Sequence, residues 1–234
     1  MKLRELQPRQ PAAALPGAGG ANSPLNRYPE AANVVYRFGV HLRGTEPPIW
    51  RLIDVPADYR FWDLHVAIQD AMGWLDYHLH EFSIIAPDSR KPVTIGIPAS
   101  DFGYDNDDVL RDSDCAIADY FRSPGDKATY IYDFGDGWQH RLALSRVLPR
   151  EPGVRYPVCR NGEGACPPED CGGVGGFRRF LNILADLDHK EHEDTQAWLN
   201  GHVGRYHPYD PEDFDPATVD FDDPQERWLR AFED

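Results

Sequence analysis

The sequence lacks any apolar run of about eighteen residues, so we expect no segment that crosses a membrane. The first twenty residues also lack the apolar core of a secretion signal, which predicts a cytoplasmic protein. Cysteine is scarce, with 4 residues in 234, and without a secretion signal we expect no disulfide framework. The chain is long enough to bury a core of ordinary size without cross-links.

Basic residues are also scarce, with 24 Lys and Arg against 39 Asp and Glu and a formal net charge of −15. Generic binding to nucleic acid depends on clustered Lys and Arg, so we expect none, although a net charge does not exclude a local basic patch. Acids gather in residues 206–234, which we predict to be an acidic C-terminal tail. Such a tail is solvated, or offers a surface to a basic protein partner, or mimics the charge of DNA.

Residues 1–32 are rich in Ala, Pro, Gly and Gln without periodicity, which predicts a disordered extension before a domain over 33–205. Apolar and polar residues alternate from Val34 to Leu42, as is typical of a strand, and a second strand is predicted from Ile49 to Val55. A helix is predicted from Phe61 to Gly73, because apolar side chains recur there at helical spacing and glycine commonly ends a helix.

The later elements follow from the same periodicities. A turn at Gly135-Asp136-Gly137 closes a hairpin, and a loop rich in Pro, Gly and Cys covers 149–176. Strands and helices are segregated, which predicts an α+β fold: a β-grasp-like mixed sheet with a crossing helix, followed by C-terminal helices. The predicted elements are strands at 78–85 and 92–97, a short helix at 112–121, the hairpin at 129–147, and helices at 177–187, 191–200 and 224–232.

Five stretches between Asn33 and Asn200 resemble a known family, the plasmid pRi open-reading-frame-three-like proteins, which are also described as passenger proteins of bacterial insertion elements. The resemblance implies a bacterial origin, the fold of that family and a link with mobile genetic elements, but no settled activity. The residues from His202 to Tyr209 and the segment around Trp228 depart from the family's usual ending. The five stretches are YRFGVHLRGTEPPIWRLIDVP, LHVAIQDAMGW, HLHEFSI, YIYDFGDGWQHRLAL and YPVCRNGEGACPPEDCGGVGGFRRFL.

The long loop contains three cysteines, Cys159, Cys166 and Cys171. Thiolates and imidazoles are the usual ligands of zinc, but this spacing is not that of a standard zinc knuckle. His80 and His140 share strand phase with apolar neighbours, so both are predicted to face the core side of the sheet, where either could supply a fourth ligand. Zinc is therefore a candidate cofactor, and free thiols packed beside hydrogen-bonded histidines are the alternative.

Carboxylates lie next to both of these segments. Asp133 and Asp136 flank the hairpin turn, before a Trp138 that is predicted to be buried, and Glu169 and Asp170 follow in the Cys loop. Together with histidines and a metal, these groups would suit metal-assisted hydrolysis or general acid–base chemistry. Alternatively, Asp136 only shapes the turn and the other carboxylates cap backbone amides.

Two functions from different classes remain open. The first is a non-enzymatic binding or interaction module, which the family resemblance links to mobile genetic elements. The second is a metal-dependent hydrolase that uses His80, His140, Asp133 and the loop from Cys159 to Cys171. A metal with an open coordination position would favour the enzyme, and a closed four-ligand site would favour the module.

Overall fold

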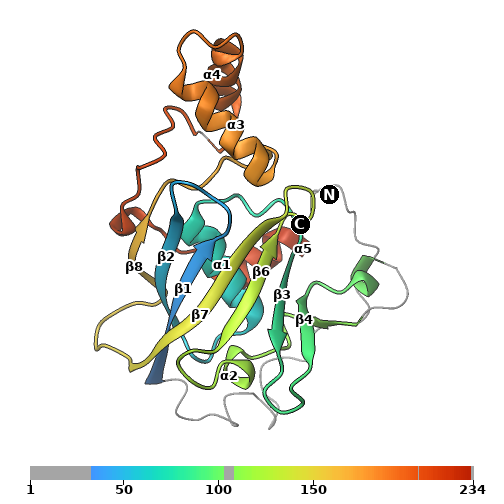
Figure 1. The fold of residues 1–234 in the computed structure, drawn as a ribbon. Helices are drawn as coiled ribbons and strands as arrows, with labels where there is room; N and C mark the ends of the chain where they lie inside the picture. The colour runs from blue at the N-terminus through green and yellow to red at the C-terminus, as the bar shows by residue number, and fades with distance from the viewer. Residues whose placement is uncertain (1–32, 103–107, 205, 233–234) are drawn as a thin grey trace.

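The computed structural model describes residues 33–102, 108–204 and 206–232. These residues form a mixed eight-stranded sheet combined with helices, which confirms the predicted α+β class (Figure 1). The predicted N-terminal extension lies outside the described residues. The strands are β1 (Val34–Leu42), β2 (Ile49–Pro56), β3 (His80–Ile85), β4 (Pro92–Gly96), β5 (Val109–Arg111), β6 (Lys127–Tyr132), β7 (Trp138–Pro149) and β8 (Val158–Glu163), and the α-helices are α1 (Phe61–Met72), α2 (Ile117–Tyr120), α3 (Gly173–Ala185), α4 (His192–Gly201) and α5 (Pro224–Phe232).

The strands follow the order β5-β4-β3-β6-β7-β1-β2-β8, and every neighbouring pair is antiparallel except β4 with β5. The predicted hairpin, β6–β7, therefore lies in the middle of the sheet, between β3 and β1. The crossing helix, α1, connects β2 to β3 and lies behind the sheet in Figure 1, with α5 close by. Within the described ranges, no helix combines the length and apolar character needed to cross a membrane.

The two faces of the sheet differ in composition because side chains alternate along each strand. One face is the core, and it buries side chains such as Phe38, Phe82 and Leu142 completely. Trp138 is 1% exposed, which confirms the prediction that it is buried, and Trp62 in α1 is 4% exposed. The opposite face, called the open face below, is turned toward the viewer in Figure 1 on β1, β7 and β6.

Helix α1 begins and ends where its sequence predicts. The side chain of Asp63 accepts a hydrogen bond from the backbone N–H of Arg60 at 2.8 Å, as part of a capping box. Gly73 then adopts a φ of 85°, and its N–H donates to the carbonyl oxygen of Gln69 at 2.8 Å. This left-handed conformation is one that glycine adopts without strain, so the helix stops at the predicted position.

Three details differ from the prediction. The loop over 149–176 contains a strand, β8, which pairs with β2 at the edge of the sheet. Helix α3 starts at Gly173, earlier than the apolar periodicity indicates. The hairpin turn begins earlier than Gly135, because β6 ends at Tyr132 and Asp133 adopts a φ of 56°, and Phe134 is 55% exposed.

The acidic C-terminal segment packs against the domain. Tyr206, Tyr209 and Phe214 are partly buried against the core. In α5, the ring of Trp228 packs edge-on against that of Trp62, with centroids 5.0 Å apart. The short predicted helix near residue 112 is limited to α2.

Candidate metal centre

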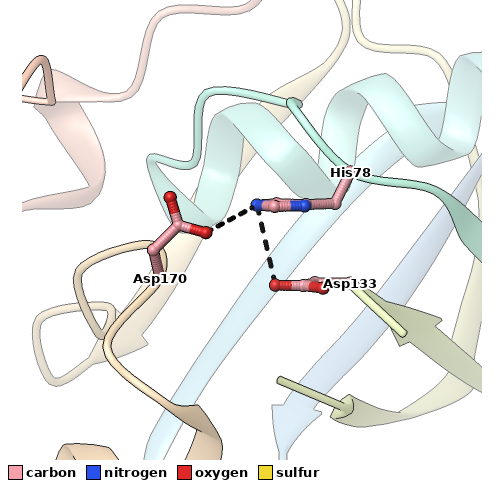
Figure 2. Close-up of side chains that lie close together, drawn as sticks. All are labelled: His78, Asp133 and Asp170. Carbon is pink, nitrogen blue, oxygen red and sulfur yellow. Dashed lines mark ion pairs between the residues drawn. The ribbon is translucent and has the colours of Figure 1, made fainter. Parts of the chain in front are cut away.

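Three side chains from distant parts of the chain meet at one end of the sheet (Figure 2). His78 lies just before β3, Asp133 directly after β6, and Asp170 in the loop between β8 and α3. Because β3 and β6 are antiparallel neighbours, the start of one lies beside the end of the other. The backbone N–H of Asp133 accordingly donates to the carbonyl oxygen of Leu79 at 3.0 Å.

The distances within this group suit a shared cation. Nε2 of His78 lies 3.2 Å from Oδ1 of Asp170 and 3.6 Å from Oδ2 of Asp133. Donor atoms that each lie about 2.1 Å from one metal stand roughly 3.0–3.4 Å apart in octahedral or tetrahedral geometry. Among the described residues, this is the one group of three or more His, Cys, Asp or Glu side chains whose ligand atoms all lie within 4.8 Å of one another.

The imidazole of His78 faces two carboxylates without completing a hydrogen bond. His78 and Asp133 are each 4% exposed, and neither ring nitrogen of His78 has a hydrogen-bond partner among the described residues. Burying such a group without a partner is costly, and a metal ion at Nε2 would remove that cost. Oδ1 of Asp133 accepts from the N–H of Gly135 at 2.8 Å, while Oδ2 is the oxygen near His78.

Both carboxylate residues of the centre adopt a left-handed backbone. The φ angle is 56° for Asp133 and 59° for Asp170, a conformation that is uncommon outside glycine but accessible to Asp and Asn. Such backbone conformations are concentrated at functional sites. Asparagine is therefore the substitution that removes each charge while it preserves the backbone.

The Cys loop reaches the centre because it is fastened to the hairpin. Oε1 of Glu169 accepts from the hydroxyl of Tyr132 at 2.9 Å, and Asp136 accepts from the N–H of Gly172 at 3.0 Å. At Gly173 the contact with the turn is so close that a Cβ atom would lie 2.4 Å from the carbonyl oxygen of Asp136. The close approach at this position therefore requires a residue without a side chain.

A pocket of about 420 Å³ adjoins the centre, between α3 and α4. Asp170 forms part of its wall, so one ligand of the centre also borders the pocket. Phe180 and Trp198 supply aromatic surface, and Arg179 forms an ion pair with Glu191 beside them. A ligand held in this pocket would lie next to a cation bound by Asp170.

A second histidine cluster lies deep in the core. The rings of His65 and His80 stack with centroids 3.5 Å apart and planes 9° from parallel. Nε2 of His65 lies 2.9 Å from Asp76, and Nε2 of His80 lies 2.9 Å from Asp112. Each imidazole of this cluster therefore has its own carboxylate partner.

Hydrogen bonding assigns the protons in this core cluster. Gln69 donates to the hydroxyl of Tyr130, which lies 2.8 Å from Nδ1 of His65. The hydroxyl then donates to Nδ1, and the Nε2–H of His65 donates to Asp76, so His65 is neutral. Burial lowers the pKa of His65 to about 4. Burial alone would raise the pKa of Asp76, but His65 and Arg227 lower it to about 2.

The residues predicted as zinc ligands are not brought together. Cys159 is buried in β8, Cys166 is buried in the loop, and Cys171 is half-buried before α3. His80 and His140 do face the core, 2% and 0% exposed, as predicted. Within the part of the chain that the structure describes, no three of these five bring ligand atoms within 4.8 Å of one another.

The thiols lie in surroundings that favour the protonated form. Burial raises the pKa of Cys159 and of Cys166, and raises that of Cys171 to about 12. Without a metal, protonated thiols pack as small apolar groups, which is the alternative that the sequence left open. The loop still passes close to His140, because Trp74 donates to the carbonyl oxygen of Pro167 at 3.0 Å and its ring centroid lies 5.3 Å from that of His140.

The predicted carboxylates divide between two roles. Asp133 and Asp170 enter the centre, whereas Asp136 and Glu169 hold the loop in place. His78 is the residue that sequence reasoning missed. The sequence did indicate that His78 points toward the core, because it lies two residues before His80 and so has the same strand phase. Its position beside Asp133, however, depends on the pairing of β3 with β6.

Comparison with known proteins agrees with the resemblance noted in the sequence. The family described as "Plasmid pRiA4b ORF-3-like protein" matches residues 34–218. The uncharacterized protein y4hQ of Sinorhizobium fredii (strain NBRC 101917 / NGR234) is 33% identical over 204 residues, which cover 84% of this chain and 95% of that protein. The crystal structure of MM3350, a protein of unknown function from Methanosarcina mazei Go1, is similar with a TM-score of 0.70 and 42% identity, over 80% of this chain and 98% of that chain.

The MM3350 structure shares the fold of this chain, both relatives match most of its length, and neither description names an activity. The family match covers β1 through the segment before α5, including all three residues of the candidate centre. The chain belongs to the plasmid pRiA4b ORF-3-like family.

Proposed function

We propose that this protein is a cation-dependent binding module, in which a divalent metal ion held by His78, Asp133 and Asp170 fastens the Cys loop to the sheet and borders a ligand pocket. The observation that carries the proposal is the convergence of three ligand atoms from three segments within 4.8 Å. The link with mobile genetic elements is part of the proposal, and it is supported by the plasmid in the family's description.

One imidazole and two carboxylates favour particular ions. Carboxylates suit Mg²⁺ and Mn²⁺, and imidazole suits Zn²⁺ and other transition metals. Mn²⁺ and Zn²⁺ accept both donor types, so they are the ions to test first. Two carboxylates neutralise the charge of a divalent ion, and the remaining coordination positions would be filled by water or by a ligand in the pocket.

The test is a direct measurement of metal binding. Full-length protein is treated with a chelator, dialysed, and titrated with MnCl₂ or ZnCl₂ by isothermal titration calorimetry. We expect one site per chain, and a loss of affinity of more than about tenfold in both Asp133→Asn and Asp170→Asn. Asp88→Asn is the control, because Asp88 is an exposed carboxylate paired with Arg122 away from the centre. Equal affinity in the wild type and both centre variants would contradict the proposal.

A second function is favoured by the pocket beside the centre. A metal with three protein ligands keeps open positions, and such a metal can activate water for hydrolysis. In this hydrolase, His78 would replace His80 and His140 of the sequence-based hypothesis, and Asp133 and Asp170 would remain. Metal-dependent turnover of an ester or phosphomonoester that disappears in Asp170→Asn would favour the hydrolase, and metal binding without turnover would favour the module.

A further inference from the structure

The open face of the sheet carries an ordered row of side chains at its centre. Trp50, His41 and Arg141 are direct cross-strand neighbours on β2, β1 and β7. The rings of Trp50 and His41 are nearly parallel, with centroids 6.1 Å apart and planes 22° apart. The indole N–H of Trp50 donates to Glu163 at 3.0 Å, which holds the ring in place. We call these two rings the stacking pair.

Small side chains lie beside this row. Gly39 and Ala143, the next residues of β1 and β7 on the open face, are also cross-strand neighbours. Neither carries a side chain that would rise above the ring of a neighbour. Both rings of the stacking pair are half-buried.

Positive charge surrounds the row in a chain whose net charge is −15. Arg37, which faces Arg146 across β1 and β7, is neutralised by Asp54 at 2.7 Å, and Asp54 also pairs with Arg160. Four further cations on this face are exposed, and none forms an ion pair within the described part of the chain. These open-face cations are Arg43, Lys127, Arg141 and Arg146.

We propose that the open face binds single-stranded nucleic acid, with bases on the stacking pair and phosphates beside the open-face cations. Aromatic rings on a protein surface stack on the flat face of any unpaired base, and neighbouring cations neutralise the backbone. The site is distinct from the metal centre, which lies at the end of the sheet and uses none of these residues.

The arrangement favours a single strand over a duplex or an acidic protein segment. In a duplex, the faces of the bases are stacked on one another and cannot reach the Trp50 ring. An acidic peptide would use the cations but would leave the stacking pair without a partner. The acids elsewhere in the protein repel phosphates, so the nucleic acid would be confined to this face.

His41 is the titratable member of the stacking pair, so its charge bears on the proposed site. Burial, together with the neighbouring Arg141, lowers the pKa of His41. The imidazole is therefore uncharged at neutral pH. The groups that face it are Arg141 on β7 and Trp50 on β2.

The experiment is fluorescence anisotropy with the full chain, in chelator, with labelled oligo-dT and oligo-rU of about ten nucleotides and a matched duplex. At about 50 mM salt we expect the single strands to bind and the duplex to fail. If three to four phosphates are contacted, the logarithm of the binding constant should fall with the logarithm of salt with a slope of about −2 to −3.

Two variants and a control locate the site. The double variant Arg141→Glu with Arg146→Glu should abolish binding, and Trp50→Ala should weaken it by about five- to a hundredfold. Arg178→Glu is the control for replacing an exposed positive charge by a negative one, because Arg178 lies on α3 and not on the open face. This variant should bind the oligonucleotides as the wild type does. The unfolding midpoint of each variant shows whether it is folded. If Trp50→Ala is unfolded, the double variant of the two exposed arginines is the test of the site.

Several results would overturn the inference. It fails if no single strand binds the wild type, if the duplex binds equally well, or if the arginine variant binds like the wild type. It also fails if a polyglutamate peptide competes as strongly as the oligonucleotides, because the face would then be a site for an acidic protein. Because chelator is present throughout, a failure of the metal proposal would leave this result unchanged.

Discussion

Buried histidines face carboxylates at two places in the described part of the chain, in the core and at the end of the sheet, and their hydrogen bonds are satisfied in opposite ways. In the core, His65 and His80 stack, and each has its own carboxylate at 2.9 Å. At the end of the sheet, the ring of His78 faces Asp133 and Asp170 but completes no hydrogen bond within the described chain.

The difference separates residues that hold the fold from residues available for a ligand. A buried imidazole bonded to a buried carboxylate contributes to folding, and removing one partner leaves the other uncompensated. An imidazole beside two carboxylates that it does not bond has donor atoms to offer. The side chain of Asp170 is 39% exposed, so an ion can approach the group at the end of the sheet from solvent, whereas the core cluster is closed.

The largest expected effect concerns the core cluster. Asp76→Asn should lower the free energy of unfolding by about 3 kcal/mol, because it removes a buried charge that faces both His65 and Arg227. Asparagine tolerates the left-handed backbone of position 76, where φ is 59°. Urea unfolding measures the change, with Asp88→Asn as the surface control that should be unchanged. A loss as small as that of the control would show that the core cluster is not structural.

The next effect concerns the centre at the end of the sheet. A metal at about 100 times its dissociation constant should raise the free energy of unfolding of the wild type by about 2.7 kcal/mol. Asp133→Asn and Asp170→Asn should show no such gain in thermal or chemical unfolding. A gain of the same size in Asp170→Asn would remove Asp170 from the ligand set.

A smaller change in the free energy of unfolding is expected at Tyr132, which joins β6 to the Cys loop. The hydroxyl of Tyr132 donates to Glu169 at 2.9 Å and accepts from the N–H of Tyr77 at 3.0 Å. Tyr132→Phe should therefore lower the free energy of unfolding by about 1.5 kcal/mol, because it removes both hydrogen bonds and leaves the N–H of Tyr77 without its partner. Oε1 of Glu169 keeps the N–H of Leu75 as a donor at 2.7 Å. The variant should also increase proteolysis in the Cys loop, which Glu169 fastens. Unaltered cleavage in a destabilised variant would mean that other contacts hold the loop.

The smallest effect is a change in pH dependence. Burial lowers the pKa of His65 to about 4 and that of His140 to about 3, below the unfolded value near 6.5. As the pH falls from about 6.5 to about 4, the unfolded chain binds protons that the folded chain does not, so the free energy of unfolding falls. Asp63, whose pKa burial raises to about 6, opposes part of this loss.

Replacing one of the two buried bases should reduce this slope. His140→Phe should reduce the slope of the free energy of unfolding against pH by at most about 1.4 kcal/mol per pH unit between pH 4.5 and 6.5. Urea unfolding in the presence of chelator measures this slope. His140 is fully buried beside the rings of Trp74 and Tyr130, so the aromatic ring of phenylalanine suits its place in the core. An unchanged slope would show that His140 does not titrate below its unfolded value.

The local sequence determined those features that depend on neighbouring residues. Alternation from Val34 to Leu42 predicted β1, and helical spacing that ends at Gly73 predicted α1. The same alternation placed His80, His140 and Trp138 on the core face. These are properties of a single strand or helix, and its period suffices to specify them.

Only the tertiary structure decided which polar groups share a site. Three cysteines in one loop made zinc a candidate, although their spacing is not that of a standard zinc knuckle. Strand β8 instead places Cys159 at the edge of the sheet, and no periodicity in that loop rich in Pro and Gly predicted the strand. The pairing of β3 with β6 brought His78 to Asp133, and the docking of the loop added Asp170. Distances between residues that are far apart in the chain depend on strand order and loop docking, and local patterns of apolar residues do not encode either.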